Sequence, residues 1–307
     1  MSFKVINING NHEQVVAELQ NKVRTKNPII FLDEPWMRKF NLGLYTRIIF
    51  SRRSIIYLHN LNRWYLNDTK WKQLYFRFIL FWINYIVVPS DTMRYELIKL
   101  TKKQVLVWPF YTEIPMQGKI GMTKEITRIV VPGSVSGKRR NYEDIIGLAK
   151  FLIVSDHAVE LVVLGSLQNN SESDEIRELS VMSHKVRVYE EFVSGEEFNE
   201  VILSSDILIA NAVECSFNDG GKEYYGRTKE TGSVFLAINS GAHLLVPTYL
   251  SVPFGLEKHV YRWDGADDLI QKVEFILKCN NKKPDYTEVV SSIMYHRNET
   301  INVLNQW

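Results

Sequence analysis

The sequence has few cysteines, a small net charge and no apolar run of great length. Its 2 cysteines, Cys215 and Cys279, have the spacing of neither a metal site nor a disulfide framework, which suits a reducing compartment. The 37 basic and 35 acidic residues nearly cancel, so a net charge of +2 gives no reason to expect a nucleic-acid partner. The longest apolar run, residues 76–88, contains Arg77 and Asn84 and is too short to span a bilayer. Because the N-terminal residues also lack the order of a signal peptide, we expect a cytoplasmic protein.

The composition is that of a folded protein with two domains. Of the 307 residues, 45% are hydrophobic and 23% are charged, as is usual for globular chains. This length suits two domains of about 150 residues each. Residues 111–124 contain one proline and two glycines and show no regular period, so they form the expected linker. We therefore predict one domain over residues 1–115 and a second over residues 116–285.

Short apolar runs alternate with segments of helical periodicity on both sides of this linker. Strands separated by helices at this spacing predict an α/β fold with two Rossmann-like, doubly wound parallel sheets. In such sheets, ligands lie beyond the carboxyl ends of the strands. The expected strands are residues 4–8, 28–32, 54–58, 85–88 and 105–108 in the first domain, and 129–131, 160–164, 186–189, 207–210 and 244–246 in the second.

Two of the expected strands in the first domain end in side chains that are able to take up a proton. Asp33 and Glu34 follow one strand, and His59 and Asn60 follow another. Since the carboxyl ends of parallel strands share one edge, Asp33 or His59 is a candidate general base toward a substrate hydroxyl. The alternative is that Asp33 caps a turn and His59 is a packing residue.

A loop with the chemistry of a phosphate site follows the first strand of the second domain. Gly133, Ser134 and Ser136 allow a backbone to approach a ligand closely, and three consecutive cations come next, at the start of a helix. Backbone N–H groups and guanidinium forks of this kind suit a diphosphate. The loop matches neither GxxxxGK[ST] nor GxGxxG, which disfavours nucleotide hydrolysis and dinucleotide binding. A solvated basic turn is the alternative. The three cations are Lys138, Arg139 and Arg140.

A second polar run of the same kind precedes an apolar segment near residue 234. Thr228, Lys229 and Thr231 stand ahead of that segment, where hydroxyl groups cap a helix and its free N–H groups attract an anion. The alternative is an ordinary capped helix. With the loop of residues 133–140, this run predicts a cradle for a pyrophosphate group.

Residues 64–82 are the most aromatic part of the chain. Basic side chains are interleaved with tryptophan and phenylalanine at helical spacing. We expect this stripe to pack against a domain or a subunit, and contact with a membrane surface is the second interpretation.

The order of these pieces resembles the GT-B glycosyltransferases, in particular the large retaining class that uses nucleotide-sugar donors. The resemblance covers residues 125–278 and, less closely, 86–109. It implies two Rossmann-like domains that face a cleft, with the acceptor domain first and the donor domain second. It also implies that residues 286–307 form a helix that crosses back to the first domain. The similar segments are VVPSDTMRYEL, VVPGSVSGKRRNYEDIIGLAKFL, ELVVLGS, VRVYEEFVSGEEFNEVILSSDILIANA, FLAINSGAHLLVP and YRWDGADDLIQKVEFIL.

The chain also departs from the pattern of that class. Members often carry two glutamates, eight residues apart, before the glycine that matches Gly241, whereas this chain has Thr228 and Leu236 there. Either Glu230 takes the place of one of them, or the chain belongs to a divergent branch. By resemblance, Val193 borders the nucleotide base. The resemblance also assigns donor binding to Ser134, Ser136, Lys138, Arg139, Arg140, Thr228 and Lys229, and the small Gly133 and the capping Thr231 complete the expected donor site.

The sequence as a whole predicts an enzyme that moves a sugar from a nucleotide donor to an acceptor hydroxyl. The expected donor is a UDP-sugar, and the acceptor is a glycan, a glycolipid or a glycoprotein in polysaccharide biosynthesis. No metal ion and no cofactor is expected, because no suitable pair of aspartates is present. One alternative is a catalytically silent GT-B partner of an active enzyme, and another is a nucleotide-sugar epimerase.

Overall fold

The computed structural model of the 307-residue chain describes Leu19, Val23 and residues 30–33, 54–62, 70–110, 126–218, 221–279 and 283–306. The chain divides into two compact units. Unit 1 comprises residues 1–110, 217–230 and 289–307, and unit 2 comprises residues 111–216 and 231–288. The sequence expectation kept residues 217–230 in the second domain, whereas contacts in the folded chain assign this segment to unit 1.

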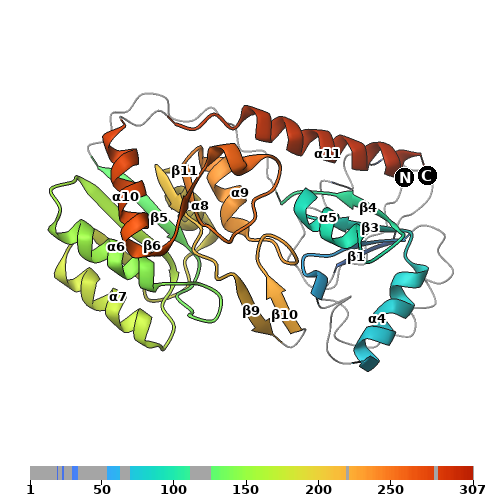
Figure 1. Ribbon diagram of the computed structural model, residues 1–307, viewed down its shortest axis with the longest axis horizontal. Coiled ribbons are helices and arrows are strands. Elements are labelled where there is room, and N and C mark those ends of the chain that lie inside the picture. The colour runs from blue at the N-terminus through green and yellow to red at the C-terminus, as the bar shows by residue number, and fades with distance from the viewer. Residues whose placement is uncertain are drawn as a thin grey trace. The chain divides into compact units, whose positions relative to one another are not determined.

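Unit 1 contains a parallel sheet of four strands in the order β1-β2-β3-β4. β2 and β3 form where apolar side chains are almost fully buried, and α5 begins where Ser90 Oγ accepts a hydrogen bond from Met93 N at 3.2 Å. α11 is held to this unit by Thr300 Oγ1, which donates to Val107 O at 2.9 Å. The elements (Figure 1) are β1 (Ile30–Asp33), β2 (Ser54–Tyr57), α4 (Lys70–Trp82), β3 (Tyr85–Val88), α5 (Asp91–Ile98), β4 (Gln104–Val107) and α11 (Thr287–Asn305).

Unit 2 contains a parallel sheet of six strands in the order β12-β11-β8-β5-β6-β7. α10, α6 and α7 pack in a row, and α8 packs on α9 (Figure 1). The strands are β5 (Thr127–Pro132), β6 (Val159–Ser166), β7 (Val186–Tyr189), β8 (Ile207–Ile209), β11 (His243–Pro247) and β12 (Val260–Trp263). The helices are α6 (Glu143–Val154), α7 (Ser171–Met182), α8 (Gly195–Leu203), α9 (Gly232–Ser240) and α10 (Gly265–Lys278), with the 3-10 helix η2 (Leu256–His259).

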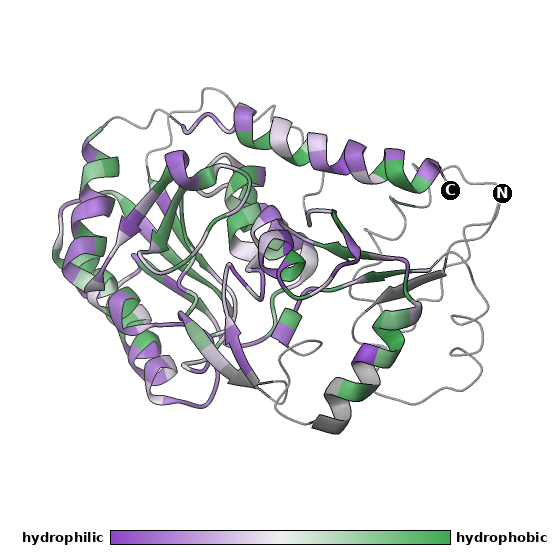
Figure 2. Ribbon diagram, turned by 45° about the vertical axis from the view of Figure 1, so that its right-hand side comes forward, coloured by the Kyte–Doolittle hydropathy of each residue, from purple (hydrophilic) through white to green (hydrophobic). Residues whose placement is uncertain are grey.

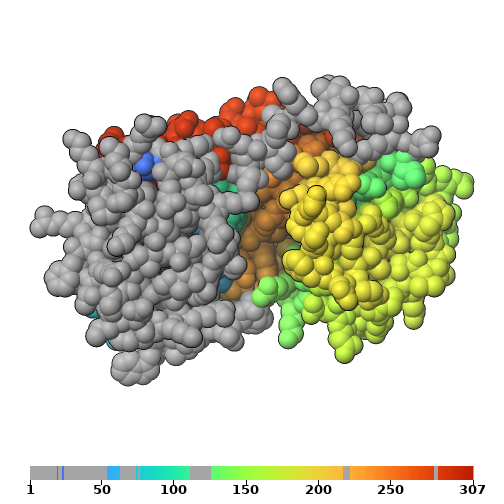
Figure 3. Space-filling view, turned by 180° about the vertical axis from the view of Figure 1, so that it is seen from behind, coloured from blue at the N-terminus to red at the C-terminus, as the bar shows by residue number. Residues whose placement is uncertain are grey.

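The core of unit 2 follows from the helical spacing that the sequence shows. Ile145, Leu148, Ala149 and Leu152 of α6 are buried and lie in one cluster with apolar side chains of β5 and β6. Figure 3 shows α8 (yellow) and the yellow-green stretch that contains α7 on one face of this unit. α9 ends at Gly241, whose φ of 67° is left-handed and therefore favours glycine.

Two further strands form a hairpin of their own, β9 (Cys215–Asn218) and β10 (Gly221–Tyr224). The division between the two units runs through β9.

The α/β class and the parallel sheets predicted from the sequence are confirmed. The hairpin and the edge strand β12 coincide with none of the strands expected from the sequence. The expected strand at residues 4–8 lies outside the described residues. Among the residues that are described, no helix is long and apolar enough to cross a membrane.

Candidate functional site in unit 2

The sheet of unit 2 changes direction between β5 and β8. The chain adds β6 and then β7 on one side of β5, and it then crosses to place β8, β11 and β12 on the other side. Counted along the chain, the strands therefore have the 3-2-1-4-5-6 order of dinucleotide-binding domains. The loops that follow β5 and β8 part at this point, so ligands of such sheets bind at their carboxyl ends.

A hollow of about 310 Å³ lies at this switch point. Its walls come from five places that are distant in sequence but meet at the carboxyl edge of the sheet. They are the loop after β5 (Gly137, Arg140, Asn141), the start of α6 (Tyr142, Glu143), the start of α7 (Glu172), the loop after β8 (Val213, Glu214) and the loop after β11 (Tyr249).

Backbone hydrogen bonds fix these loops to one another. Asn141 N donates to Asn211 O at 2.9 Å, and Val213 N donates to Arg139 O at 3.1 Å. Tyr249 Oη donates to Ala212 O at 3.0 Å, which adds the loop after β11. These bonds fix the positions of the loops that form the walls of the hollow relative to one another.

Among the described residues that line the hollow, Arg140 is the cation. Its guanidinium lies against Gly133, whose φ is 103°, so closely that a Cβ on Gly133 would overlap it. No ion pair of Arg140 is present within the described parts of the chain, and its side chain is half-buried. Its charge is therefore available to an anionic ligand.

The Tyr142 side chain is hydrogen-bonded to the same loop. Its Oη donates to Gly133 O at 3.0 Å. Burial raises the pKa of Tyr142 to about 12, although the Arg140 guanidinium and a hydrogen bond with Asn211 act in the opposite direction. The hydroxyl therefore keeps its proton at neutral pH and holds the Gly133 carbonyl in place.

The lining of the hollow is more acidic than the sequence suggested. Glu143, Glu172 and Glu214 face it together with Arg140, whereas Lys138 and Arg139 are exposed and are not part of its walls. Carboxylates accept hydrogen bonds from hydroxyl groups, and a guanidinium binds phosphate oxygens. The arrangement suits a ligand that carries both a phosphate group and several hydroxyl groups.

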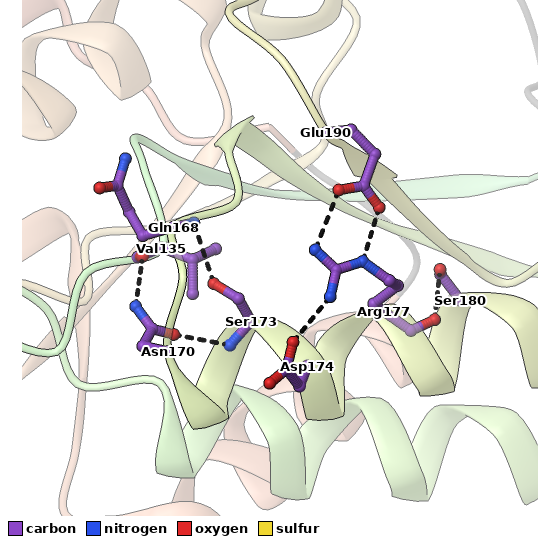
Figure 4. Close-up of polar contacts among 8 residues, drawn as sticks. All are labelled: Val135, Gln168, Asn170, Ser173, Asp174, Arg177, Ser180 and Glu190. Carbon is purple, nitrogen blue, oxygen red and sulfur yellow. Dashed lines mark hydrogen bonds and ion pairs between the residues drawn. The ribbon is translucent and has the colours of Figure 1, made fainter.

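Asn170 connects the loop after β5 with the first turn of α7 (Figure 4). Its Oδ1 accepts from Ser173 N at 2.8 Å, and its Nδ2 donates to Val135 O at 3.0 Å. Gln168 N donates to Ser173 Oγ at 3.0 Å in the same cluster. Further along α7, Arg177 pairs with Glu190 at 2.8 Å. One side chain thus caps the helix and holds the loop that leads to Arg140.

We expect Asn170→Ala to destabilise unit 2 by about 1–2 kcal/mol, since it removes a helix cap and a hydrogen bond to the loop. Asn170→Ser keeps a capping oxygen and loses the donor to Val135 O without adding a charge, so it separates the two effects. Urea denaturation followed by circular dichroism measures both variants. If the alanine variant is as stable as the wild type, this role of Asn170 is wrong.

Two further expected donor residues, Ser134 and Ser136, lie in this loop and are half-buried. Val193 follows β7 and is only 6% exposed, whereas the preceding Phe192 is 90% exposed. Val193 is not part of the walls of the hollow. Its expected place beside a nucleotide base stays a prediction.

Candidate acceptor-side residues in unit 1

The carboxyl ends of β1 and β2 lie side by side in unit 1. Asp33, the last residue of β1, pairs in register with Tyr57, the last residue of β2, and His59 follows two residues later. The backbone therefore brings Asp33 and His59 to one edge of the sheet, as the sequence predicted.

A buried ion pair lies next to this edge. Glu223 of β10 is 2% exposed, and its Oε2 accepts from Lys229 Nζ at 2.6 Å. Asn60 Nδ2 donates to Glu223 Oε1. Leu61 N also donates to Thr228 O at 2.8 Å, so residues 221–230 are attached to the loop after β2.

This arrangement corrects the expectation that Thr228 and Lys229 stand at a helix start. α9 begins at Gly232, and Thr231 occupies the cap position without making the side-chain capping bond. Thr228 instead closes the turn after β10, where its Oγ1 accepts from Tyr224 N at 2.9 Å. These residues belong to unit 1, and Thr231 belongs to unit 2.

Lys229 therefore differs from Arg140 in what surrounds its charge. The ammonium group is paired with the Glu223 carboxylate, whereas the guanidinium of Arg140 has no such partner within the described residues. Glu230, the next residue, is 8% exposed. Sequence reasoning missed Glu223, although the Tyr224-Tyr225-Gly226 run that follows it is a strand-and-turn signal.

In the part of the chain that the structure describes, no group of three His, Cys, Asp or Glu side chains is close enough to hold a metal ion.

Similarity to known structures

No protein-family model and no curated protein sequence matches this chain. Solved structures do match it along nearly its whole length. A glycosyltransferase from Rickettsia africae ESF-5 superposes with a TM-score of 0.62 at 12% identity, over 98% of this chain and 84% of that one. A UDP-forming α,α-trehalose-phosphate synthase from Burkholderia xenovorans, in complex with glucose-6-phosphate, gives 0.58 at 8% identity, over 95% and 76%. An E. coli trehalose-6-phosphate protein bound with UDP-2-fluoro glucose gives 0.57 at 9% identity, over 95% and 74%.

These superpositions define the class of fold. The chain has the fold of the GT-B glycosyltransferases, with two parallel-sheet units of the kind that the sequence predicted.

Proposed function

We propose that this protein is a glycosyltransferase that moves a sugar from a nucleoside-diphosphate donor to an acceptor hydroxyl. The observation that carries the proposal is the hollow at the switch point of unit 2, where Arg140 and three glutamates face one volume. Since two of the matching structures are described with a UDP-sugar analogue or as UDP-forming, a UDP-sugar is the proposed donor.

Transfer of the sugar leaves a nucleoside diphosphate with more negative charge than it carries in the donor. Groups that are already arranged around that charge lower the barrier. Arg140 and the backbone N–H groups of residues 133–137 take this role in our proposal, with Ser134 and Ser136 as further donors. Lys138 and Arg139 are exposed, so they attract the anionic donor from solution.

The carboxylates of the hollow would bind the part of the donor that carries hydroxyl groups. Glu143, Glu172 and Glu214 are suited to accept hydrogen bonds from a sugar or a ribose. The proposal needs no metal ion, because the cation and the N–H groups meet the diphosphate directly.

On the acceptor side, His59 or Asp33 would orient or deprotonate the attacking hydroxyl. Glu230 is the proposed carboxylate in place of the absent glutamate pair. The acceptor is a glycan, a glycolipid or a glycoprotein. Cys215 and Cys279 are both free thiols, so we propose a reducing compartment such as the cytoplasm.

A donor screen tests this proposal. We expect one nucleoside-diphosphate sugar, first of all a UDP-sugar, to raise the melting temperature, since a ligand that binds only the folded state stabilises it. The UDP-, GDP- and ADP-sugars and the free diphosphates are each added at about 1 mM, which covers weak binding. If none of them binds, the proposal is wrong.

The same screen separates the rival functions. Release of free nucleotide only when an acceptor is added indicates transfer. Binding without any turnover across a panel of acceptors would identify a silent partner of another enzyme. A changed sugar without an acceptor would identify an epimerase.

A further inference from the structure

α4 carries two apolar faces, although a helix of unit 1 needs only one. Ile79 and Leu80 are 1% and 4% exposed, and through them the helix packs against the rest of unit 1. On the other side, Phe78 is 52% exposed and Phe81 is 70% exposed. The described part of α4 is accordingly mostly green in Figure 2, with a purple band. The second face has no partner among the described residues, and Leu74 (61%) and Trp82 (36%) complete it.

The exposed side chains form one continuous surface. The ring centroids of Phe81 and Trp82 are 5.2 Å apart, and those of Phe78 and Trp82 are 6.5 Å apart, both edge to face. At about 100° per residue, Leu74 and Arg77 share one side of the helix with these three rings. Single exposed apolar residues are ordinary, but a contiguous group marks an interaction site.

Basic side chains accompany this face. Arg77 shares it, and the sequence of α4 contains no acidic residue. At the end of the helix, Lys103 Nζ donates to Phe81 O at 3.0 Å and to Ile83 O, so another cation lies beside the exposed rings. Exposed tryptophan and phenylalanine with flanking cations match the boundary between anionic lipid headgroups and acyl chains.

We propose that the face formed by Leu74, Arg77, Phe78, Phe81 and Trp82 lies in the surface of an anionic lipid bilayer. The apolar side chains enter the acyl boundary, and Arg77 and Lys103 meet the lipid phosphates. The helix lies on the membrane and does not cross it, because its 13 residues are too few to span the acyl core. This contact would hold unit 1 at a membrane surface, independently of donor binding in unit 2.

Vesicle sedimentation with the full-length chain tests the proposal. We expect binding to vesicles that contain about 30% phosphatidylglycerol, and at least about tenfold weaker binding to pure phosphatidylcholine. The double variant Phe81→Gln, Trp82→Gln should lose most binding to both vesicle types. Arg77→Gln should weaken binding only to the anionic vesicles, as should about 0.5 M salt.

Phe275→Gln is the matched control, since Phe275 is 54% exposed on α10 of unit 2. It should bind vesicles as the wild type does. Thermal unfolding and donor binding should be unchanged in all three variants, so that a failure here is told apart from a failure of the proposed function. If the wild-type protein binds neither vesicle type, the proposal is wrong. The proposal is also wrong if the wild type forms a dimer that the Phe81→Gln, Trp82→Gln variant does not form, since the face would then bind a second copy of the chain.

Discussion

Replacing Arg140 by alanine is expected to weaken binding of a nucleoside diphosphate by roughly 10- to 100-fold, the range that charge-assisted hydrogen bonds contribute. Arg140 is the cation in the walls of the hollow, and no carboxylate among the described residues pairs with it. Its side chain is half-buried and makes no hydrogen bond to the described fold, so the variant should melt within about 2 °C of the wild type. Isothermal titration with UDP measures the affinity.

Two further variants make this test specific. Gly133→Ala should also weaken binding, because its new Cβ would overlap the Arg140 guanidinium and displace it. The φ of 103° at this position also disfavours alanine. Arg177→Ala is the matched control, since this exposed arginine pairs with Glu190 and is not part of the walls of the hollow. Equal losses in Arg140→Ala and Arg177→Ala would contradict a specific role for Arg140.

Replacing Lys229 by alanine is expected to lower the free energy of unfolding of unit 1 by about 3–5 kcal/mol. We expect this loss of stability to exceed any loss of donor-binding free energy in the same variant. The variant leaves the Glu223 carboxylate buried, at 2% exposure, without the ammonium that now lies 2.6 Å away. Removing one partner of a buried ion pair leaves an uncompensated charge, which is the costly case. Urea denaturation with tryptophan fluorescence measures the change.

The double variant Glu223→Gln, Lys229→Met should recover most of that stability, because it removes both charges and keeps an acceptor for Asn60. Lys99→Ala in the same unit is the control, since Lys99 and Glu96 form an exposed pair at 3.0 Å that should contribute less than about 1 kcal/mol. A Lys229→Ala variant as stable as Lys99→Ala would show that the pair is not buried in solution.

The parallel sheets were predictable because their strands contain short apolar runs, most of which are buried. Residues 85–88 and 186–189 coincide with β3 and β7. The hairpin of β9 and β10 was not predictable in this way, since its polar strands pair mainly with each other and have no apolar run. β12 is an edge strand of four residues whose apolar pattern is too short to separate it from the helix that follows.

The candidate site was predictable only where one segment supplies it. The loop of residues 133–140 was found because glycine, serine and arginine occur together in sequence. Glu172 and Glu214 were missed because they come from α7 and from the loop after β8, and only the strand order brings them to the hollow. The ionic partner of Lys229 was missed although Glu223 lies in the same segment, because the turn after β10 brings the two side chains together.

A crystal structure of the full-length chain with a UDP-sugar tests the central claim most directly. We predict that the diphosphate lies within hydrogen-bonding distance of the Arg140 guanidinium and of backbone N–H groups of residues 133–137. The hydroxyl groups of the donor should contact at least one of Glu143, Glu172 and Glu214. A donor bound elsewhere on the protein, with the hollow at the switch point empty, would contradict the claim.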